Sequence, residues 1–150
     1  MRSMTSNSVG CVILLLLAMA PAAARADDAI GQVKTEAGTV TVERAGKPVA
    51  LAIGDHVFQA DTVVTGPDGS VGITFADNSM MTLGPDSRLA LDQFRFDPTT
   101  EAGAFDSSLK QGTLAVKSGQ IVQQTPEAMH IRTPAALLGV RGTEFVVRAD

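Results

Sequence analysis

The chain has 150 residues, of which 12 are lysine or arginine and 16 are aspartate or glutamate, and it contains one cysteine but no tryptophan or tyrosine. This acidic balance leaves no basic stripe to neutralise phosphates, which argues against nucleic acid as a partner. The absence of tryptophan and tyrosine removes the usual sugar-stacking side chains and argues against a lectin.

The first 26 residues have the pattern of a secretory signal peptide. Arg2 precedes an apolar run from Val9 to Ala20, and Ala24-Arg25-Ala26 forms a small-x-small cleavage pattern. The run is shorter than the roughly 20 residues that a membrane-spanning helix needs. We therefore expect cleavage near Ala26, a periplasmic or secreted protein, and no membrane span in the mature chain. A retained anchor is the alternative.

Residues 27–150 form the predicted domain. Cleavage would remove two arginines and the cysteine, so the remaining chain would carry ten basic and 16 acidic residues and no thiol. A chain of this length suits one domain with its own core. Its dominant pattern is a short apolar–polar alternation broken by Gly, Pro, Asp and Asn, which indicates an all-β fold.

The first regular pattern predicts a β-hairpin. Val40 and Val42 face one way, Ala45-Gly46 supplies a turn, and the alternation resumes from Val49 to Ile53. A further strand or two follows and ends at the strong turn signal of residues 66–69, "GPDG".

The most regular stretch contains three aspartates spaced nine residues apart, Asp68, Asp77 and Asp86. Each aspartate begins a short polar segment. Between these segments, apolar and polar residues alternate, as expected for half-buried strands. Short strands with turns at this spacing predict a single all-β domain in a β-solenoid-like or twisted β-sandwich arrangement. The predicted inward positions are Val71, Ile73, Phe75, Met81, Leu83, Leu89, Leu91, Phe94 and Phe96.

The same three aspartates raise the question of calcium binding. Calcium-binding nonapeptide repeats place paired glycines beside the aspartate in every turn. Here Gly69 follows the first aspartate, whereas Asn78 and Ser87 follow the other two. Capping of turns by carboxylates that bond backbone amides is therefore the preferred interpretation, and calcium is the alternative.

Beyond Phe96 we expect a loop over residues 97–108 and then more strands. The "PAALLGV" segment, residues 134–140, tolerates a helix, but Pro134 and Gly139 bound it so closely that at most one turn would form. The expected inward positions in this part of the chain are Leu114, Val116, Ile121, Met129, Ile131 and Phe145 to Val147.

The sequence offers little material for a catalytic or metal site. His56 and His130 are isolated, and no pair of ligands has zinc-binding spacing. No serine lies in a Gly-x-Ser-x-Gly elbow, and no glycine-rich loop opens a helix. We expect a protein that is not an enzyme and that uses no cofactor.

Four stretches, in order, resemble the FecR domain family. They are "GQVKTEAGTVTVERAGKPVAL", "IGDHVFQADTVVTGPDGSVGITFADNSMMTLGPDSRLAL", "LKQGTLAVKSG" and "IRTPAALLGVRGTEFVV". The last contains a threonine–proline pair followed by Val-Arg-Gly-Thr-Glu-Phe, and together the stretches cover most of residues 27–150. Asn78 stands where family members often have glycine.

The resemblance implies an all-β periplasmic module. The family's signalling members receive a signal from an outer-membrane TonB-dependent receptor and pass it to a sigma-factor regulator, usually for iron uptake. Those members also carry a cytoplasmic anti-sigma segment and one transmembrane helix. This chain is expected to have a cleavable signal and almost nothing before the module, so the iron-regulator role is not expected to transfer. The resemblance therefore implies a secreted β module that works by binding.

The motif residues of the last stretch are Thr133, Pro134, Gly139, Arg141, Gly142, Thr143 and Glu144. One interpretation is a brace, in which Arg141 pairs with Glu144 or with carbonyls and fixes the last strands. The other is an interaction surface presented by Arg141 and Thr143. The preferred function is a non-catalytic module that binds or senses and docks to another cell-envelope protein. The alternatives are a self-assembling structural protein and a binder of a small ligand or metal ion.

Overall fold

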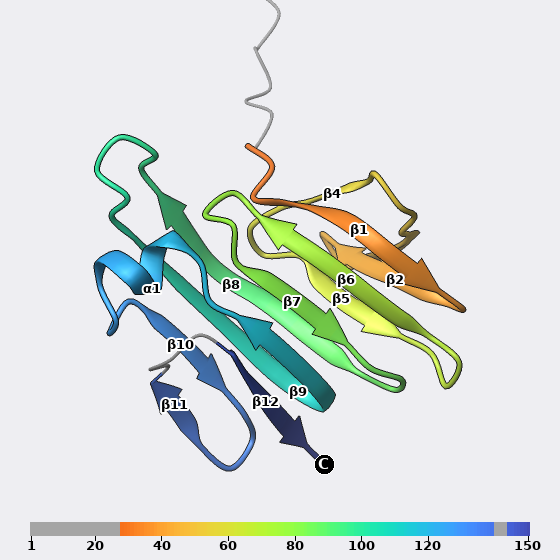
Figure 1. Cartoon of the computed structure of the whole chain (residues 1–150). Helices are drawn as coiled ribbons and strands as arrows, with labels where there is room; N and C mark the ends of the chain where they lie inside the picture. Colours follow the sequence, from red (N-terminus) through yellow and green to blue (C-terminus); the bar gives the residue numbers. More distant parts are fainter. Residues whose placement is uncertain (1–27, 140–143) are drawn as a thin grey trace, which may run out of the picture.

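The computed structural model describes residues 28–139 and 144–150, which form strands and one short helix (Figure 1). Among these residues, all of the strand pairings are antiparallel except that of β9 with β10. The predicted all-β class and single domain are confirmed. The elements are β1 Gly31–Ala37, β2 Val40–Arg44, β3 Lys47–Ala50, β4 His56–Val57, β5 Thr62–Thr65, β6 Ser70–Phe75, β7 Met80–Leu83, β8 Arg88–Phe96, β9 Gly103–Lys117, α1 Gln120–Gln124, β10 Met129–Arg132, β11 Leu137–Gly139 and β12 Glu144–Ala149.

The strands belong to one curled sheet, in the order β3-β2-β5-β8-β9-β7-β6-β1-β4, with β10, β11 and β12 attached beside β9. The long strand β9 joins two layers. Its first part, up to Gln111, pairs with β8 and β10, and its last part, from Gly112, pairs with β7 and β12. We call β4, β1, β6, β7, the end of β9 and β12 the first layer. The second layer contains β3, β2, β5, β8, the start of β9, β10 and β11.

Most of the apolar residues that the sequence pattern predicts to face inward line one continuous core. Val33, Leu89 and Leu114 are fully buried, and Phe105 contacts Phe75 and Phe94 edge-on, with ring centroids 4.7 and 5.0 Å away. The buried residues come from both layers, so the curl of the sheet encloses the core.

Two local features follow the sequence pattern closely. The hairpin of β2 and β3 turns at Ala45 and Gly46, whose φ values of 51° and 77° are those of a two-residue type I′ turn. In β8 the inward face shifts from Leu91 to Phe94, because the pairing with β9 changes register between Ala90 and Gln93. A bulge of this kind shifts the inward–outward alternation of the following side chains by one residue.

Two expectations about local structure are wrong. Ile121 was expected on a strand, yet it is buried on the short helix α1, which starts where Gln120 donates to the carbonyl oxygen of Asp77 at 2.8 Å. A contact from a distant turn therefore overrides the local pattern. The loop expected over residues 97–108 ends at Ala102, because Phe105 needs a core position opposite Phe94 on β8.

Two further details concern the end of the chain. The segment expected to tolerate one helical turn instead forms a turn at residues 133–136 and the strand β11. Val146 was grouped with the inward residues, but it is 69% exposed, whereas Val147 is buried. Successive side chains on a strand point to opposite faces, so only one of the two can reach the core.

Candidate functional site

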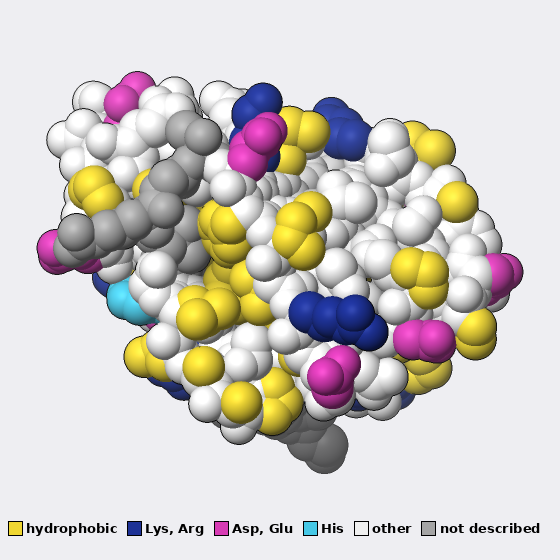
Figure 2. All heavy atoms as spheres, turned by 60° about the horizontal axis from the view of Figure 1, so that its bottom comes forward, with side chains coloured by type: hydrophobic (Ala, Val, Ile, Leu, Met, Phe, Trp, Pro, Cys, Tyr) yellow, Lys and Arg dark blue, Asp and Glu magenta, His cyan; other side chains and the backbone are white. Residues whose placement is uncertain are grey.

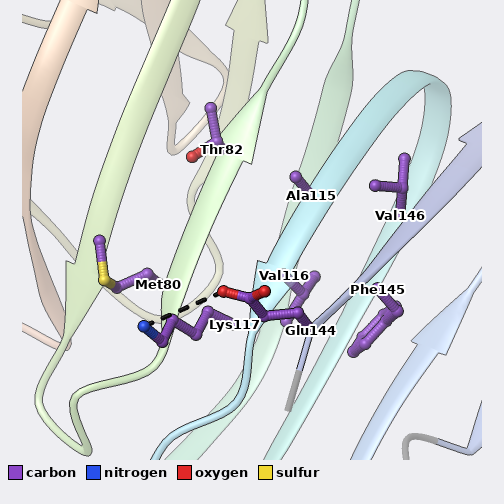
Figure 3. Close-up of a pocket in the computed structure, with 8 residues that line it drawn as sticks. All are labelled: Met80, Thr82, Ala115, Val116, Lys117, Glu144, Phe145 and Val146. Atoms are coloured by element: carbon purple, nitrogen blue, oxygen red, sulfur yellow. Dashed lines mark ion pairs between the residues drawn. The ribbon is translucent and has the colours of Figure 1, made fainter. Parts of the chain in front are cut away.

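A hollow lies on the outer face of the first layer, where β7, β9 and β12 run side by side (Figure 3). Strand register aligns Thr82, Ala115 and Val146 in one row across these strands. The small Ala115 lies between two larger neighbours, which leaves the surface recessed. The hollow has a volume of about 540 Å³ and is lined by Met80, Thr82, Ala115, Val116, Lys117, Glu144, Phe145 and Val146.

The next row along the same strands supplies a charged border. Met80 on β7 aligns with Lys117 on β9, which aligns with Glu144 on β12. The Lys117 Nζ atom lies 3.9 Å from the Glu144 Oε1 atom, and both side chains are exposed (Figure 3). An exposed pair at this distance contributes little to stability, so both charges are available to a partner.

Exposed apolar side chains flank this border. Met80 and Val146 in the hollow are among the large hydrophobic residues that the described chain exposes. Figure 2, turned so that the bottom of Figure 1 comes forward, shows hydrophobic side chains gathered on this side of the molecule with charged side chains around them. Apolar side chains grouped beside charges are typical of interaction surfaces.

Among the described motif residues, Glu144 lines the hollow, whereas Thr133, Pro134 and Gly139 belong to the hairpin of β10 and β11. Thr133 and Pro134 lie in a tight turn between β10 and β11, in which the Ala136 backbone N–H donates to Thr133 Oγ1 at 3.1 Å. Gly139 ends β11, and Glu144 opens β12 and reaches Lys117. Arg141, Gly142 and Thr143 lie outside the described residues. The choice between a brace and an interaction surface at Arg141 therefore stays a prediction.

The three aspartates of the nine-residue spacing lie in three separate turns. Asp77 is fully buried, and its carboxylate accepts hydrogen bonds from Ser79 Oγ at 2.6 Å and from the Ser79 backbone N–H at 3.0 Å. Asp68 accepts from the Thr39 backbone N–H at 3.3 Å, and Asp86 is exposed at a φ of 50°. Within residues 28–139 and 144–150, no group of three His, Cys, Asp or Glu side chains is placed to hold a metal ion.

One charged pair that the sequence pattern did not indicate is Arg44 with Asp61. Asp61 is 2% exposed and accepts from Arg44 Nε at 3.0 Å, from Arg44 Nη2 at 2.8 Å and from the Phe58 backbone N–H at 2.9 Å. The Arg44 guanidinium also lies 4.6 Å from the centre of the Phe58 ring. The hydrogen bond to Asp61 raises the pKa of Arg44 above its ordinary value.

The two histidines lie apart from the hollow's lining. His56 is exposed on β4, and His130 on β10 places its Nδ1 atom 3.1 Å from Asp106 Oδ1 on β9. In the described part of the chain, no helix has the length and apolar character needed to cross a membrane.

A family model described as "FecR protein" matches residues 61–150. A solved structure titled "Cell surface anchoring domain" is 40% identical to this chain, with a TM-score of 0.40, and the match covers 41% of this chain and 82% of that one. None of the curated proteins matches the chain.

Proposed function

Because the chain belongs to the FecR family, we propose that it is an exported, non-catalytic module that docks to another cell-envelope protein in signalling. The predicted signal peptide over residues 1–26 supports export, although it lies outside the described residues. The proposed docking surface is the hollow between β7, β9 and β12. The observation that carries the proposal is the combination of exposed Met80 and Val146 with the weakly paired charges of Lys117 and Glu144.

The chemistry of the hollow indicates a protein partner. Its recess at Ala115 can receive an apolar side chain, while Lys117 and Glu144 can exchange their weak ion pair for charges on the partner. Glu144 also belongs to the sequence motif shared with the family, so the surface includes one of the predicted site residues.

Site-specific photo-crosslinking in cells tests this proposal. The full chain would carry p-benzoylphenylalanine at Met80, and Val49 on β3 gives a matched control because the two side chains are 47% and 44% exposed. We expect an adduct with one envelope protein from position 80 and none from position 49, with mass spectrometry identifying the partner. The same adducts from both positions, or none from position 80, would contradict the proposal.

A second variant tests whether the recess itself is used. Ala115→Gln fills the hollow from the outer face of β9. We expect the adduct yield at position 80 to fall about tenfold, equivalent to roughly 1.4 kcal/mol of binding free energy. An unchanged melting temperature would show that the fold is intact.

A further inference from the structure

Within residues 28–139 and 144–150, the strand β12 is paired along one edge and open along the other. It pairs with β9 on one side, and no strand in the described part of the chain pairs with its other side. An unpaired strand edge presents backbone N–H and C=O groups that can form a ladder with another strand. Which strand can pair there depends on the side chains that β12 presents.

The side chains of β12 have a pattern that is complementary to itself. Glu144, Val146 and Arg148 point outward and are exposed, whereas Val147 and Ala149 are buried and Phe145 is half-buried. Along the strand, the outer face thus carries a negative, an apolar and a positive side chain, in that order. When such a strand pairs antiparallel with a copy of itself about Val146, Glu144 lies opposite Arg148 of the second copy, and the two Val146 side chains meet. Directly opposite residues share a face, and opposite charges there are favourable.

Other registers are worse. A shift that centres the pair on Val147 places Glu144 opposite Asp150 of the second copy, which is a like-charge pair. A centre on Phe145 places Glu144 opposite Val146 and leaves its charge without a partner. A shift of one residue would put outward residues opposite inward ones and mix the two faces. The register about Val146 is the one that satisfies both charge and burial.

We propose that two copies of this chain pair antiparallel along β12 to form a two-fold symmetric dimer with Val146 on the axis. The first layer then continues across the two copies as one sheet. Its outer face carries a row of Lys117, Glu144 and then Arg148 of the second copy, with alternating charge. On the inner face, Phe145 lies opposite Val147 of the second copy and loses its remaining exposure to water. The ion pair of Arg148 with Asp150 does not oppose this arrangement, because both side chains are highly exposed.

This proposal goes beyond the docking function and does not depend on it. The two sites share Glu144 and Val146, but the dimer forms along the edge of β12 and docking uses the outer face around Ala115. Crosslinks from Met80 to another envelope protein report on docking, and sedimentation of the purified variants reports on the dimer, so that either can fail alone.

Charge reversal tests the register. Glu144→Arg would place arginine opposite Arg148 of the second copy, and Arg148→Glu would place glutamate opposite Glu144. Because of the symmetry, each change creates two like-charge pairs in a dimer. We expect each single variant to weaken dimerisation about tenfold or more in sedimentation equilibrium of protein purified from cells that express the full chain. The double variant restores complementarity and should dimerise as the original chain does.

The singly changed residues are exposed, so folding should be unaffected, and equal melting temperatures would verify this. A monomeric original chain at about 100 µM, well above the micromolar affinities typical of weak specific complexes, would overturn the proposal. Equal dimerisation by all four proteins would overturn it as well, since it would place the dimer contact elsewhere.

Disulfide trapping gives an independent test. Cys11, the only cysteine of the chain, is first replaced by serine. Val146→Cys should then yield a disulfide-linked dimer under oxidation, because directly opposite Cβ atoms on paired strands lie about 4.5–5.5 Å apart, near the distance that a disulfide spans. Val49→Cys on the edge strand β3 is the control and should stay monomeric. Equal dimer yields from both positions would contradict the two-fold pairing along β12.

Discussion

Arg44 and Asp61 form a structural brace that joins the end of β2 to the residue before β5. The pairing of β2 with β5 aligns Glu43 with Thr62, which brings the next residue on β2 beside Asp61. The two charges lie 17 positions apart in the sequence, and no local pattern links them. Their contact becomes predictable only once the strand pairing is known.

Arg44→Ala should lower the free energy of unfolding by about 2–3 kcal/mol, because it leaves the buried Asp61 carboxylate without its charged donor. The 40% exposure of Arg44 places the expected loss below that of a fully buried pair. Arg88→Ala is the matched control. Arg88 pairs with Glu43 at the surface, and both are partly exposed, so its loss should cost less than about 1 kcal/mol. Urea denaturation measures both, and equal losses would show that the Arg44 pair is an ordinary surface contact.

Other residues show what sequence alone could supply. Asn78, noted as standing where the family often has glycine, has a φ of 65°, a left-handed conformation that glycine adopts freely and asparagine tolerates. By contrast, the sequence did not show whether Val146 or Val147 points outward. That choice depends on the inward–outward alternation along β12, in which Val146 is exposed and Val147 is buried. The hollow itself was not predictable, since it arises from the side-by-side placement of three strands.

The bend of β9 between the layers depends on Gly112. Its φ of 94° lies in the left-handed region, and a Cβ atom there would collide with Ser87. Ser87 is also bonded on this side, since the Thr113 backbone N–H donates to Ser87 Oγ at 3.0 Å. The change from one layer to the other is therefore made at a position where only glycine fits.

Gly112→Ala should destabilise the protein by about 2–4 kcal/mol, because it adds backbone strain and a steric clash at the bend. Gly84→Ala is the control. A Cβ atom there would make ordinary contacts with Thr113 at 3.6 Å, and its φ is not in the left-handed region, so we expect a change within about 0.5 kcal/mol. Thermal unfolding compares the two variants. A Gly112 variant as stable as the control would mean that the bend does not require glycine.

Elements with strong alternation were predicted well, and those that depend on distant contacts were not. The β2–β3 hairpin and the strands β6 to β8 follow from apolar alternation and turn residues. The helix α1 does not, because its first turn relies on Asp77, whose backbone carbonyl and carboxylate accept from Gln120 and Ile121.

The N-terminal strands complete a fold that extends beyond the family match. The match begins at residue 61, yet β1 pairs with β6 and β2 pairs with β5 across that boundary. Val33 and Val42 from these early strands are buried in the common core. The brace at Arg44 also crosses the boundary. The two parts of the chain therefore form one folding unit.

A chain that starts at residue 61 should not fold on its own. It would lose the early strands' core residues and leave β5 and β6 with open edges, which favours aggregation. A chain covering residues 27–150 serves as the control and should melt in one cooperative transition by circular dichroism. Cooperative melting of the shorter chain would show that the early strands are dispensable.

The alternation in the sequence sets the fold class but not the layer arrangement. A solenoid-like fold and a twisted sandwich share the same short strands and turns, and both were compatible with the pattern. What distinguishes the observed curled sheet is the 15-residue strand β9, of which residues 103–108 were expected to be loop. Long-range pairings, rather than local propensity, decide this level of structure.

The position of β9 has a consequence for how the molecule opens. The strand is flanked by β8 and β10 in its first part and by β7 and β12 in its second. Its amide hydrogens are thus enclosed in ladders on both sides and should be the slowest to exchange with deuterated water. Peeling of an outer strand such as β3 or β11 leaves β9 in place, whereas release of β9 disconnects both layers together. Local fraying therefore leaves β9 paired, whereas global unfolding requires its release.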